Sequence, residues 1–375
     1  MTPRLSQSRL TPDAFAAVMA TGILSIAALN HDYTRMSNVL GILATVALAV
    51  LVAMVVAVAV AKHRVLPWDL SDPQVTFSLF TFVAACAVLN NRLSSQYPPV
   101  LPIFGVVAGV AWLGLVVLTM RNVGRLRWAA LRDHVHGAWL LSSVATSGLA
   151  IVAAKLLTNT GQRQWLMVAL PLWILALITY LLLTSLMVWR AVTQRLDREG
   201  FEPDSWLLTG SVAIAAVAGY FMHRQSRDGL AGTLHAVTLT AWAVATMWIP
   251  PLIYFGLRHI KRRPDMLRFT GAWWTLVFPL GMYSVATSLV ADLTHWRSLG
   301  TVALVVFWDA LLVWVSVAIG GVMRVLRALG AISGHGPRQP HQSGAAQRNR
   351  RGLAAAPHAD ASGSGSTSLG LGYRR

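Results

Sequence analysis

The sequence has few charged residues, few acids and a single cysteine. Asp and Glu number 14 against 31 Lys and Arg, and charged residues make up 12% of the 375-residue chain. Because Cys86 is the only cysteine, an intrachain disulfide and a cysteine-based metal or iron–sulfur cluster are excluded. Hydrophobic residues account for 55% of the chain, and the mean hydropathy is +0.56. This composition is typical of an integral membrane protein rather than a soluble enzyme.

Ten apolar stretches come close to the roughly 20 residues that cross a bilayer as a helix. They fall at 12–30, 37–61, 73–90, 99–120, 136–157, 165–189, 206–223, 232–257, 271–291 and 300–323. The sequence therefore predicts an all-α integral membrane protein with ten transmembrane helices. Residues 1–11 form its N-terminus and 12–323 its transmembrane domain. Residues 324–375, basic and rich in Gly, Ser and Pro, are expected to be a disordered tail.

The ten stretches alternate between two kinds. Odd-numbered stretches carry Ser, Thr and Gly in their middles, for example TGILS at 21–25 and SSVATSG at 142–148. Even-numbered stretches such as 40–61 are mostly hydrocarbon. Hydroxyl groups at membrane depth commonly bond their own helix or a neighbour, so helix packing is one explanation. The regular alternation favours a second one, in which the odd helices form an inner ring around a polar axis and the even helices a lipid-facing collar.

The basic residues indicate how the chain crosses the membrane. Of the 31 Lys and Arg, 24 lie in the N-terminus, the C-terminal tail and the loops at 61–72, 121–135, 190–205 and 258–270. The positive-inside rule then predicts that both termini are cytoplasmic in a multi-pass protein of the cell membrane. Among the loops, the cluster RHIKRRPDMLR (258–268) contributes most, with contact to anionic lipid or to a soluble partner as alternatives. Nucleic acid is not an expected partner, because the basic residues lie between apolar stretches.

Short connections predict that neighbouring helices pair as antiparallel hairpins. Loops such as 31–36, 91–98, 158–164 and 224–231 leave little room for any other arrangement. Five hairpins follow in series, each with a more polar first helix and an oilier second one. This weak repeat of roughly 60–65 residues is of the kind that builds a transport path along a symmetry axis. Five inner helices enclose only a narrow gap, which a single aromatic ring would close.

Three motifs resemble a known family. PDAFAAVMATGILS (12–25), HGAWLLSSVATSGLAI (136–151) and WWTLVFPLGMYSVAT (273–287) are similar to the tellurite-resistance and C4-dicarboxylate transporter family. Its plant members are the slow anion channels, and its fungal members include sulfite and malate transporters. Over residues 12–323 the resemblance implies five helical hairpins in quasi-fivefold order around a central anion pathway, and assembly as a homo-oligomer, commonly a trimer. It also implies that a phenylalanine on the ninth span, here Phe278, closes the pore.

The residues around Phe278 are compatible with that role. Pro279 removes a backbone hydrogen bond and bends its helix, and a ring beside the bend can be aimed at the axis. Thr275 and Met282 share the face of Phe278, so this face is mixed rather than lipid-like. The alternative is an ordinary packed aromatic ring. Family members often kink several inner helices at proline, whereas among the inner helices expected here only the ninth span has a proline in its middle.

The predicted pathway contains hydroxyl groups but no fixed charge in its middle. The candidate lining residues are Thr21, Gly22, Ser25, Thr76, Thr81, Ser143, Thr146, Ser147, Thr275 and Ser288. Lys155 is near a helix end, from which its side chain can extend to the interface. An anion would then meet hydroxyls, helix dipoles and a ring edge, which favours passage over tight binding. We expect selectivity to follow the dehydration cost of each anion.

Other ionisable residues suggest competing functions. Asp309 is the one acid deep in a span, where it suggests proton coupling, a hydrogen bond to a neighbour or a subunit contact. His134 and His136 point to opposite sides of a helix, so they do not form a metal site together. His223 and His235 flank a loop and can approach one another, but no carboxylate or thiol accompanies them. The sequence therefore predicts no metal and no cofactor.

The function favoured by these observations is transport of small inorganic or organic anions, not catalysis. A proton-coupled C4-dicarboxylate carrier and an exporter of sulfite or tellurite-type oxyanions are the alternatives within transport. A membrane redox enzyme would need paired histidines for haem on facing helices, and a receptor would need a soluble output domain. Neither feature is evident in the sequence. The physiological anion, the direction of transport and the gating signal are not encoded in any motif.

Overall fold

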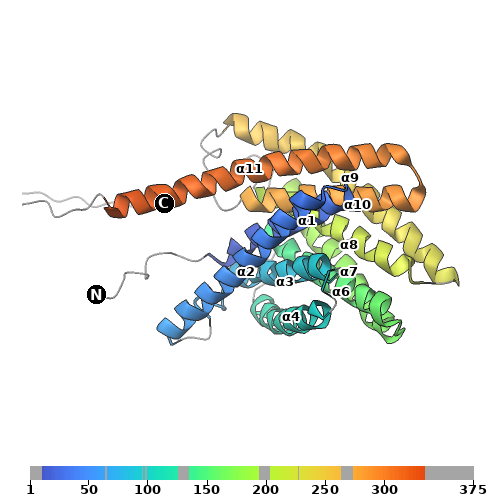
Figure 1. Ribbon diagram of the computed structural model, residues 1–375, viewed down its shortest axis with the longest axis horizontal. Helices are drawn as coiled ribbons and strands as arrows, with labels where there is room; N and C mark the ends of the chain where they lie inside the picture. Colours follow the sequence, from blue (N-terminus) through green and yellow to red (C-terminus); the bar gives the residue numbers. More distant parts are fainter. Residues whose placement is uncertain are drawn as a thin grey trace, which may run out of the picture. The chain divides into compact units, whose positions relative to one another are not determined.

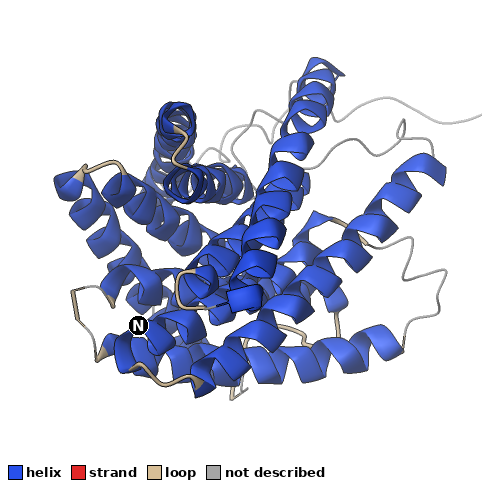
Figure 2. Cartoon of the chain, turned by 90° about the vertical axis from the view of Figure 1, so that its right-hand side faces the viewer, coloured by secondary structure: helices blue, strands red, loops and turns tan. Residues whose placement is uncertain are grey.

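The protein is helical throughout the part of the chain that the structure describes. A computed structural model describes residues 11–63, 66–94, 96–97, 99–125, 135–193, 203–226, 228–262 and 273–333. Every regular element within these ranges is a helix (Figures 1 and 2). The chain divides into two units, Met1–Leu326 and Arg327–Arg375. All ten predicted spans belong to the first.

Within the described ranges, ten helices are long and apolar enough to cross a membrane, as the sequence predicts. The first five are α1 (Phe15–Asn30), α2 (Thr34–Ala61), α3 (Pro73–Leu93), α4 (Val100–Gly124) and α6 (Leu141–Thr160). The others are α7 (Gln164–Thr193), α8 (Leu207–His223), α9 (Asp228–Arg262), α10 (Trp274–Thr294) and α11 (Arg297–Ser333). Short 3₁₀ turns precede three of them, namely η2 (Pro12–Ala14), η3 (Gly137–Leu140) and η4 (Pro203–Trp206).

Burial separates the helices into the two predicted kinds. In the most apolar 18-residue segment of each span, between 61% and 83% of the residues are buried in α1, α3, α6, α8 and α10. In α2, α4, α7, α9 and α11 the corresponding share is 17% to 28%. The odd spans therefore form the interior and the even spans the periphery, where long hydrophobic faces are exposed to the surroundings. An apolar exposed face of this length is what a lipid-facing helix needs.

The five inner helices close into a ring. Helix α1 packs against α3, α3 against α6, α6 against α8, α8 against α10, and α10 against α1. The first four outer helices each pack against the inner helix that precedes them, and α11 is joined to α10 by the hydrogen bond from Ser284 to the Ala303 carbonyl. The expected quasi-fivefold order of five hairpins is thus the arrangement of the fold (Figure 1).

Glycine allows four of the five contacts within the inner ring to be close. At each of these positions a methyl group would come within about 3 Å of the facing helix, closer than packed atoms normally approach. The facing pairs are Gly22 with Val88, Gly148 with Ala87, Gly210 with Pro279, and Gly281 with Ile23. Small residues at helix interfaces are a common device in membrane proteins, because lipid supplies no hydrophobic force between helices.

Several helices extend beyond the apolar stretches. α9 continues to Arg262, so the first five residues of the basic 258–268 cluster are helical and do not form a loop as the sequence suggested. The remainder of that cluster lies outside the described residues. α11 continues to Ser333, which is past residue 323, the expected end of the transmembrane domain. Residues 334–375 of the predicted tail and residues 1–10 also lie outside the described ranges.

Candidate functional site

Polar side chains on the inner helices are bonded outward to the second helix of their own hairpin. In each hairpin one such side chain donates a hydrogen bond to a backbone carbonyl of the outer helix. The five bonds are Ser25 to Ser37 (2.7 Å), Asn90 to Leu101 (2.9 Å), Ser143 to Ala176 (2.8 Å), Thr209 to Ala245 (3.5 Å) and Ser284 to Ala303 (2.7 Å). The device is therefore repeated five times around the ring.

A second set of bonds joins each outer helix to the inner helix of the next hairpin. In four cases an indole N–H is the donor, from Trp112 to Thr146 (2.8 Å), Trp173 to the Ala215 carbonyl (2.8 Å), Trp242 to Thr287 (3.1 Å) and Trp314 to Thr21 (2.9 Å). Between α2 and α3 the guanidinium of Arg92 donates to Asn38 (2.7 Å) and to Ser25 (2.9 Å). Each outer helix thus connects two consecutive inner helices.

These two sets and one further bond engage half of the residues that the sequence places along the pathway. Thr21, Ser25, Ser143 and Thr146 each bond a residue of an outer helix. Thr76 accepts a hydrogen bond from Asn122 of α4 at 3.0 Å. The positions of their hydroxyls are explained by contact between the two rings. Sequence reasoning recognised the polar bias of the inner helices but not the direction of each side chain.

The other candidate residues are placed differently. Gly22 is at the contact with Val88. Thr81 donates to the Ser78 carbonyl of its own helix at 2.6 Å, and Thr275 is buried. The Ser147 hydroxyl is fully buried and has no hydrogen-bond partner among the described residues. Ser288 donates to the Val285 carbonyl (2.8 Å) and accepts from Asn30 of α1 (3.0 Å). Among the described residues, the hydroxyls of Thr81, Ser147 and Ser288 are thus not bonded to outer helices.

Phe278 is completely buried on α10. Four residues define the sides of this helix: Ser284 bonds α11, the Tyr283 hydroxyl bonds Thr246 of α9 (2.9 Å), Gly281 meets α1 and Pro279 meets α8. At 100° per residue, Phe278 lies about 60° beyond the side that meets α1 and about 120° from the side that meets α11. Its ring therefore leaves the helix between the α1 and α8 sides, away from both outer helices.

Proline is distributed as the sequence predicts. Among the described inner helices, α10 alone has a proline in its interior, Pro279. The outer helices α7 and α9 also contain interior prolines, at Pro171 and at Pro250 with Pro251. Because Pro279 cannot donate a backbone hydrogen bond, the carbonyl one turn earlier in α10 is released from its usual partner. Gly210 gives this segment of α10 close contact with α8.

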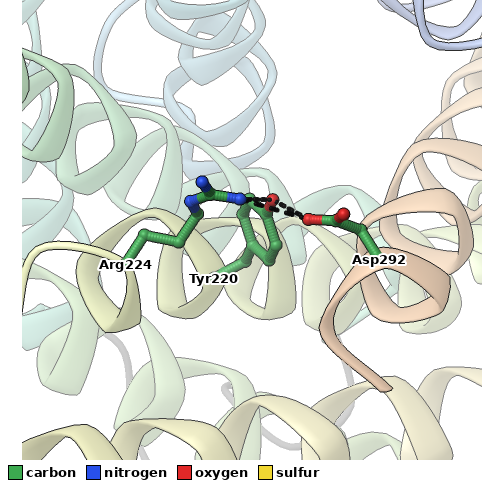
Figure 3. Close-up of polar contacts among 3 residues, drawn as sticks. All are labelled: Tyr220, Arg224 and Asp292. Atoms are coloured by element: carbon green, nitrogen blue, oxygen red, sulfur yellow. Dashed lines mark hydrogen bonds and ion pairs between the residues drawn. The ribbon is translucent and has the colours of Figure 1, made fainter. Parts of the chain in front are cut away.

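The C-terminal ends of the inner helices carry a cluster of polar and charged groups. Tyr220 and Arg224 at the end of α8 both bond the Asp292 carboxylate of α10, with Arg224 at 3.3 Å (Figure 3). The hydrogen bond with Tyr220 and the charge of Asp292 raise the pKa of Arg224, so this guanidinium is always charged. On α6, the Lys155 ammonium donates to the Asn91 carbonyl of α3 at 2.8 Å.

The remaining sequence candidates lie away from the ring interior or outside the described part. Asp309 is exposed on outer helix α11, and it forms no hydrogen bond or ion pair with the described residues. His223 and His235 do approach, with ring centroids 5.4 Å apart. His136 precedes η3 and contacts Trp139, while His134 is not described. No group of three metal-ligating side chains occurs among the residues that the structure describes.

The fold can be compared with known proteins. The family model described as voltage-dependent anion channel matches residues 9–322, which include all ten spans. The chain belongs to this family. The match confirms the resemblance drawn from the three motifs, and it places the protein among membrane channels and transporters for anions.

Relatives in other organisms are named as membrane proteins or transporters. An uncharacterized membrane protein of Mycobacterium tuberculosis is 28% identical over 172 residues, which cover 44% of this chain and 85% of the relative. An uncharacterized transporter of Methanocaldococcus jannaschii is 22% identical over 330 residues, or 81% of this chain and 90% of the relative. A second transporter of that archaeon is 21% identical over 197 residues, or 52% and 57%. The similarity to the first of these two archaeal transporters extends across most of the ten-helix domain.

Proposed function

We propose that small anions cross the membrane along the axis enclosed by α1, α3, α6, α8 and α10, and that Phe278 closes this axis in the described conformation. The observation that carries the proposal is the placement of Phe278. Its side chain is fully buried on an inner helix, on the side away from both outer helices, and it directly precedes Pro279, the proline in the interior of that helix. A ring at such a point needs only a small rotation to change the width of a narrow path.

The wall of this path is more apolar than the sequence suggested. Hydroxyls such as Ser25 and Ser143 are held between the two rings, while Met282 and Val285 share the side of α10 on which Phe278 lies. We propose that Thr81, Ser147, Thr275 and Ser288 supply the remaining hydroxyls of the pathway. With few polar groups and no fixed charge in the middle, a permeating anion must lose part of its hydration, so large weakly hydrated anions should pass most easily.

Thiol accessibility tests this lining. Cys86 is buried, so a cysteine introduced elsewhere is the reactive thiol of the chain. Cysteines at Ser147 and Thr275 should react with a small water-soluble methanethiosulfonate once Phe278 is replaced by alanine. Cysteine at Ser143 should react far more slowly, because that side chain contacts α7. Equal rates at Ser143 and Ser147 would remove the distinction between the two kinds of hydroxyl.

A chloride-efflux assay on proteoliposomes tests the gate. Phe278→Ala should accelerate efflux strongly and lower the melting temperature less than a core truncation does, because the space that the fully buried ring vacates on the axis can fill with water. Phe80→Ala is the matched control, since Phe80 is a buried phenylalanine on inner helix α3. Because Phe80 is a core residue, Phe80→Ala should lower the free energy of unfolding by about 3–5 kcal/mol and should not accelerate chloride efflux. The gate is rejected if Phe278→Ala behaves like Phe80→Ala.

We also propose that the protein is a homo-oligomer of the cell membrane, a trimer as the family resemblance implies. Asp309 supports a subunit contact, because a carboxylate in mid-span on the exposed side of an outer helix is costly against lipid. The same exposure gives no support to proton coupling, which would need the carboxylate on the pathway. Asp309→Leu should alter the oligomer mass measured by native mass spectrometry. An unchanged oligomer would show that the carboxylate is not at a contact.

Both termini are proposed to be cytoplasmic, from the distribution of Lys and Arg. In intact cells, a cysteine at Arg262, the last residue of α9, should be inaccessible to an impermeant thiol reagent. A cysteine at Arg163, in the loop between α6 and α7, should be labelled. Labelling in the opposite pattern would invert the topology.

A further inference from the structure

Lys155 lies within the inner ring instead of extending to solvent. Its ammonium donates to the Asn91 carbonyl of α3 and lies 5.6 Å from the ring centroid of Phe221 on α8. Helices α3 and α8 are the two ring neighbours of α6, while α4 and α7 cover its outer side. A side chain of α6 that touches both ring neighbours therefore lies on the side facing the axis.

The helical register of α6 supports this placement. Thr146 accepts the indole N–H of Trp112, so it marks the side of α6 that faces outer helix α4. Lys155 follows Thr146 by nine residues, which is two and a half turns and puts the two side chains on opposite sides of the helix. The contacts and the register thus agree that the ammonium points toward the axis.

The surroundings of Lys155 leave its charge available to a ligand. An ammonium has three N–H donors, and the Asn91 carbonyl takes one. Among the described residues Lys155 forms no ion pair, and no second hydrogen bond is made to them. Phe221 presents a ring face, which stabilises the cation without neutralising it. This partly buried cation therefore has no counter-ion among the described residues.

The positive charge of Lys155 lies where the dipoles of the inner helices are negative. Each hairpin returns the chain to its starting side, so the five inner helices run parallel and their C-terminal ends gather at one mouth. Each such end carries a partial charge of roughly −0.5, which repels an anion there. Lys155 is near the C-terminal end of α6 and offsets this field, whereas the charge of Arg224 is shared with Asp292.

We infer that Lys155 forms an anion-binding site at the mouth formed by the C-terminal ends of the inner helices. Its ligand is a small monovalent anion such as chloride or nitrate, held by the free N–H groups of the ammonium. The inference rests on the proposed function for its place in permeation, but the binding itself does not require an open gate. Phe278 lies near the N-terminal end of α10, so the two residues lie toward opposite ends of the path.

Binding can be measured without conduction. Potassium nitrate should raise the melting temperature of the wild-type protein by a few degrees relative to potassium gluconate at the same ionic strength, because a ligand of the folded state stabilises it. Lys155→Gln should lose this difference and Lys155→Arg should keep most of it. Arg163→Gln is the matched control, since Arg163 is exposed in the loop that follows α6. Equal nitrate stabilisation in wild type and Lys155→Gln would overturn the site.

Conduction tests the same residue in the pathway. In the Phe278→Ala background, Lys155→Gln should lower chloride conductance roughly three- to tenfold at low salt and much less at 1 M salt, where the charge is screened. Arg163→Gln should change it little. In a Cys86→Ala background, Lys155→Cys should regain conductance after aminoethyl methanethiosulfonate, which restores a positive charge, and not after its sulfonatoethyl analogue. Rescue by both reagents or by neither would overturn the role in permeation.

The two assays separate the possible failures. If Phe278→Ala carries no chloride current while nitrate still stabilises the protein through Lys155, the proposed pathway fails and the anion site stands. If the current is present but Lys155→Gln matches Arg163→Gln in both assays, the pathway stands and the site is rejected.

Discussion

Alanine substitutions at Ser143 and Ser147 separate the two roles that an inner-helix hydroxyl can have. The two residues are one turn apart on α6, and both are fully buried. Ser143 donates to the Ala176 carbonyl of α7 at 2.8 Å, whereas Ser147 has no partner among the described residues. The substitutions remove the same atom from the same helix, so a difference between them reports on the hydrogen bond.

The expected effects have different magnitudes. A net hydrogen bond contributes about 0.5–1.5 kcal/mol, and bonds between membrane helices average about 0.6 kcal/mol. Ser143→Ala should therefore destabilise the protein by about 1 kcal/mol, without changing anion selectivity. Ser147→Ala removes a buried hydroxyl that is unsatisfied, so its effect on stability should be near zero or favourable. If Ser147 lines the path, its loss should instead alter the ratio of chloride to nitrate flux.

Thermal unfolding in detergent and flux in proteoliposomes measure both quantities on the same preparations. A loss of about 1 kcal/mol corresponds to a decrease of roughly 1–2 °C in the melting temperature of a chain of this size. The reasoning is refuted if Ser147→Ala destabilises more than Ser143→Ala. It is also refuted if Ser143→Ala changes the flux ratio and leaves the melting temperature alone.

Three further predictions concern stability. Gly210→Ala should lower the free energy of unfolding by about 1–3 kcal/mol, because its Cβ would lie 3.0 Å from the backbone of α10. Gly232→Ala, with open space around it, should raise the free energy of unfolding by about 0.5–1 kcal/mol, measured by urea or thermal unfolding. A double-mutant cycle of Trp314→Phe and Thr21→Val should give a coupling of about 0.6–1.7 kcal/mol, and additive effects would exclude the bond. Burial lowers the pKa of His31, so the unfolded state binds the proton more readily. Stability should fall as the pH decreases below 6.5, and His31→Gln should weaken that dependence in melting curves.

The ten spans and their division into two rings were predictable from the sequence. Both follow from local properties, namely the length of each apolar stretch and the presence or absence of polar residues within it. The ends of the helices were less accurate, because α9 and α11 continue through residues such as Arg262 and Arg324 that are too polar for a membrane-span pattern. A helix does not need lipid to continue, so hydropathy underestimates its length.

The directions of polar side chains were not predictable in the same way. Ser143 and Ser147 look alike in sequence, and what distinguishes them is the position of the Ala176 carbonyl on another helix. A signal did exist for the bonds between hairpins, because Trp112 and Trp314 are placed near the middle of even stretches. Lys155 was expected to extend toward the interface, yet its partners come from two helices that are adjacent only after the ring has closed.

Currents in planar bilayers under a potassium chloride gradient test the central claim most directly. The account predicts that Phe278→Ala gives a large current that reverses near the chloride equilibrium potential, while wild type and Phe80→Ala give little current. A Phe278→Ala protein that folds like the wild type and carries no anion current, or a current that reverses near the potassium potential, would contradict an anion pathway closed by Phe278.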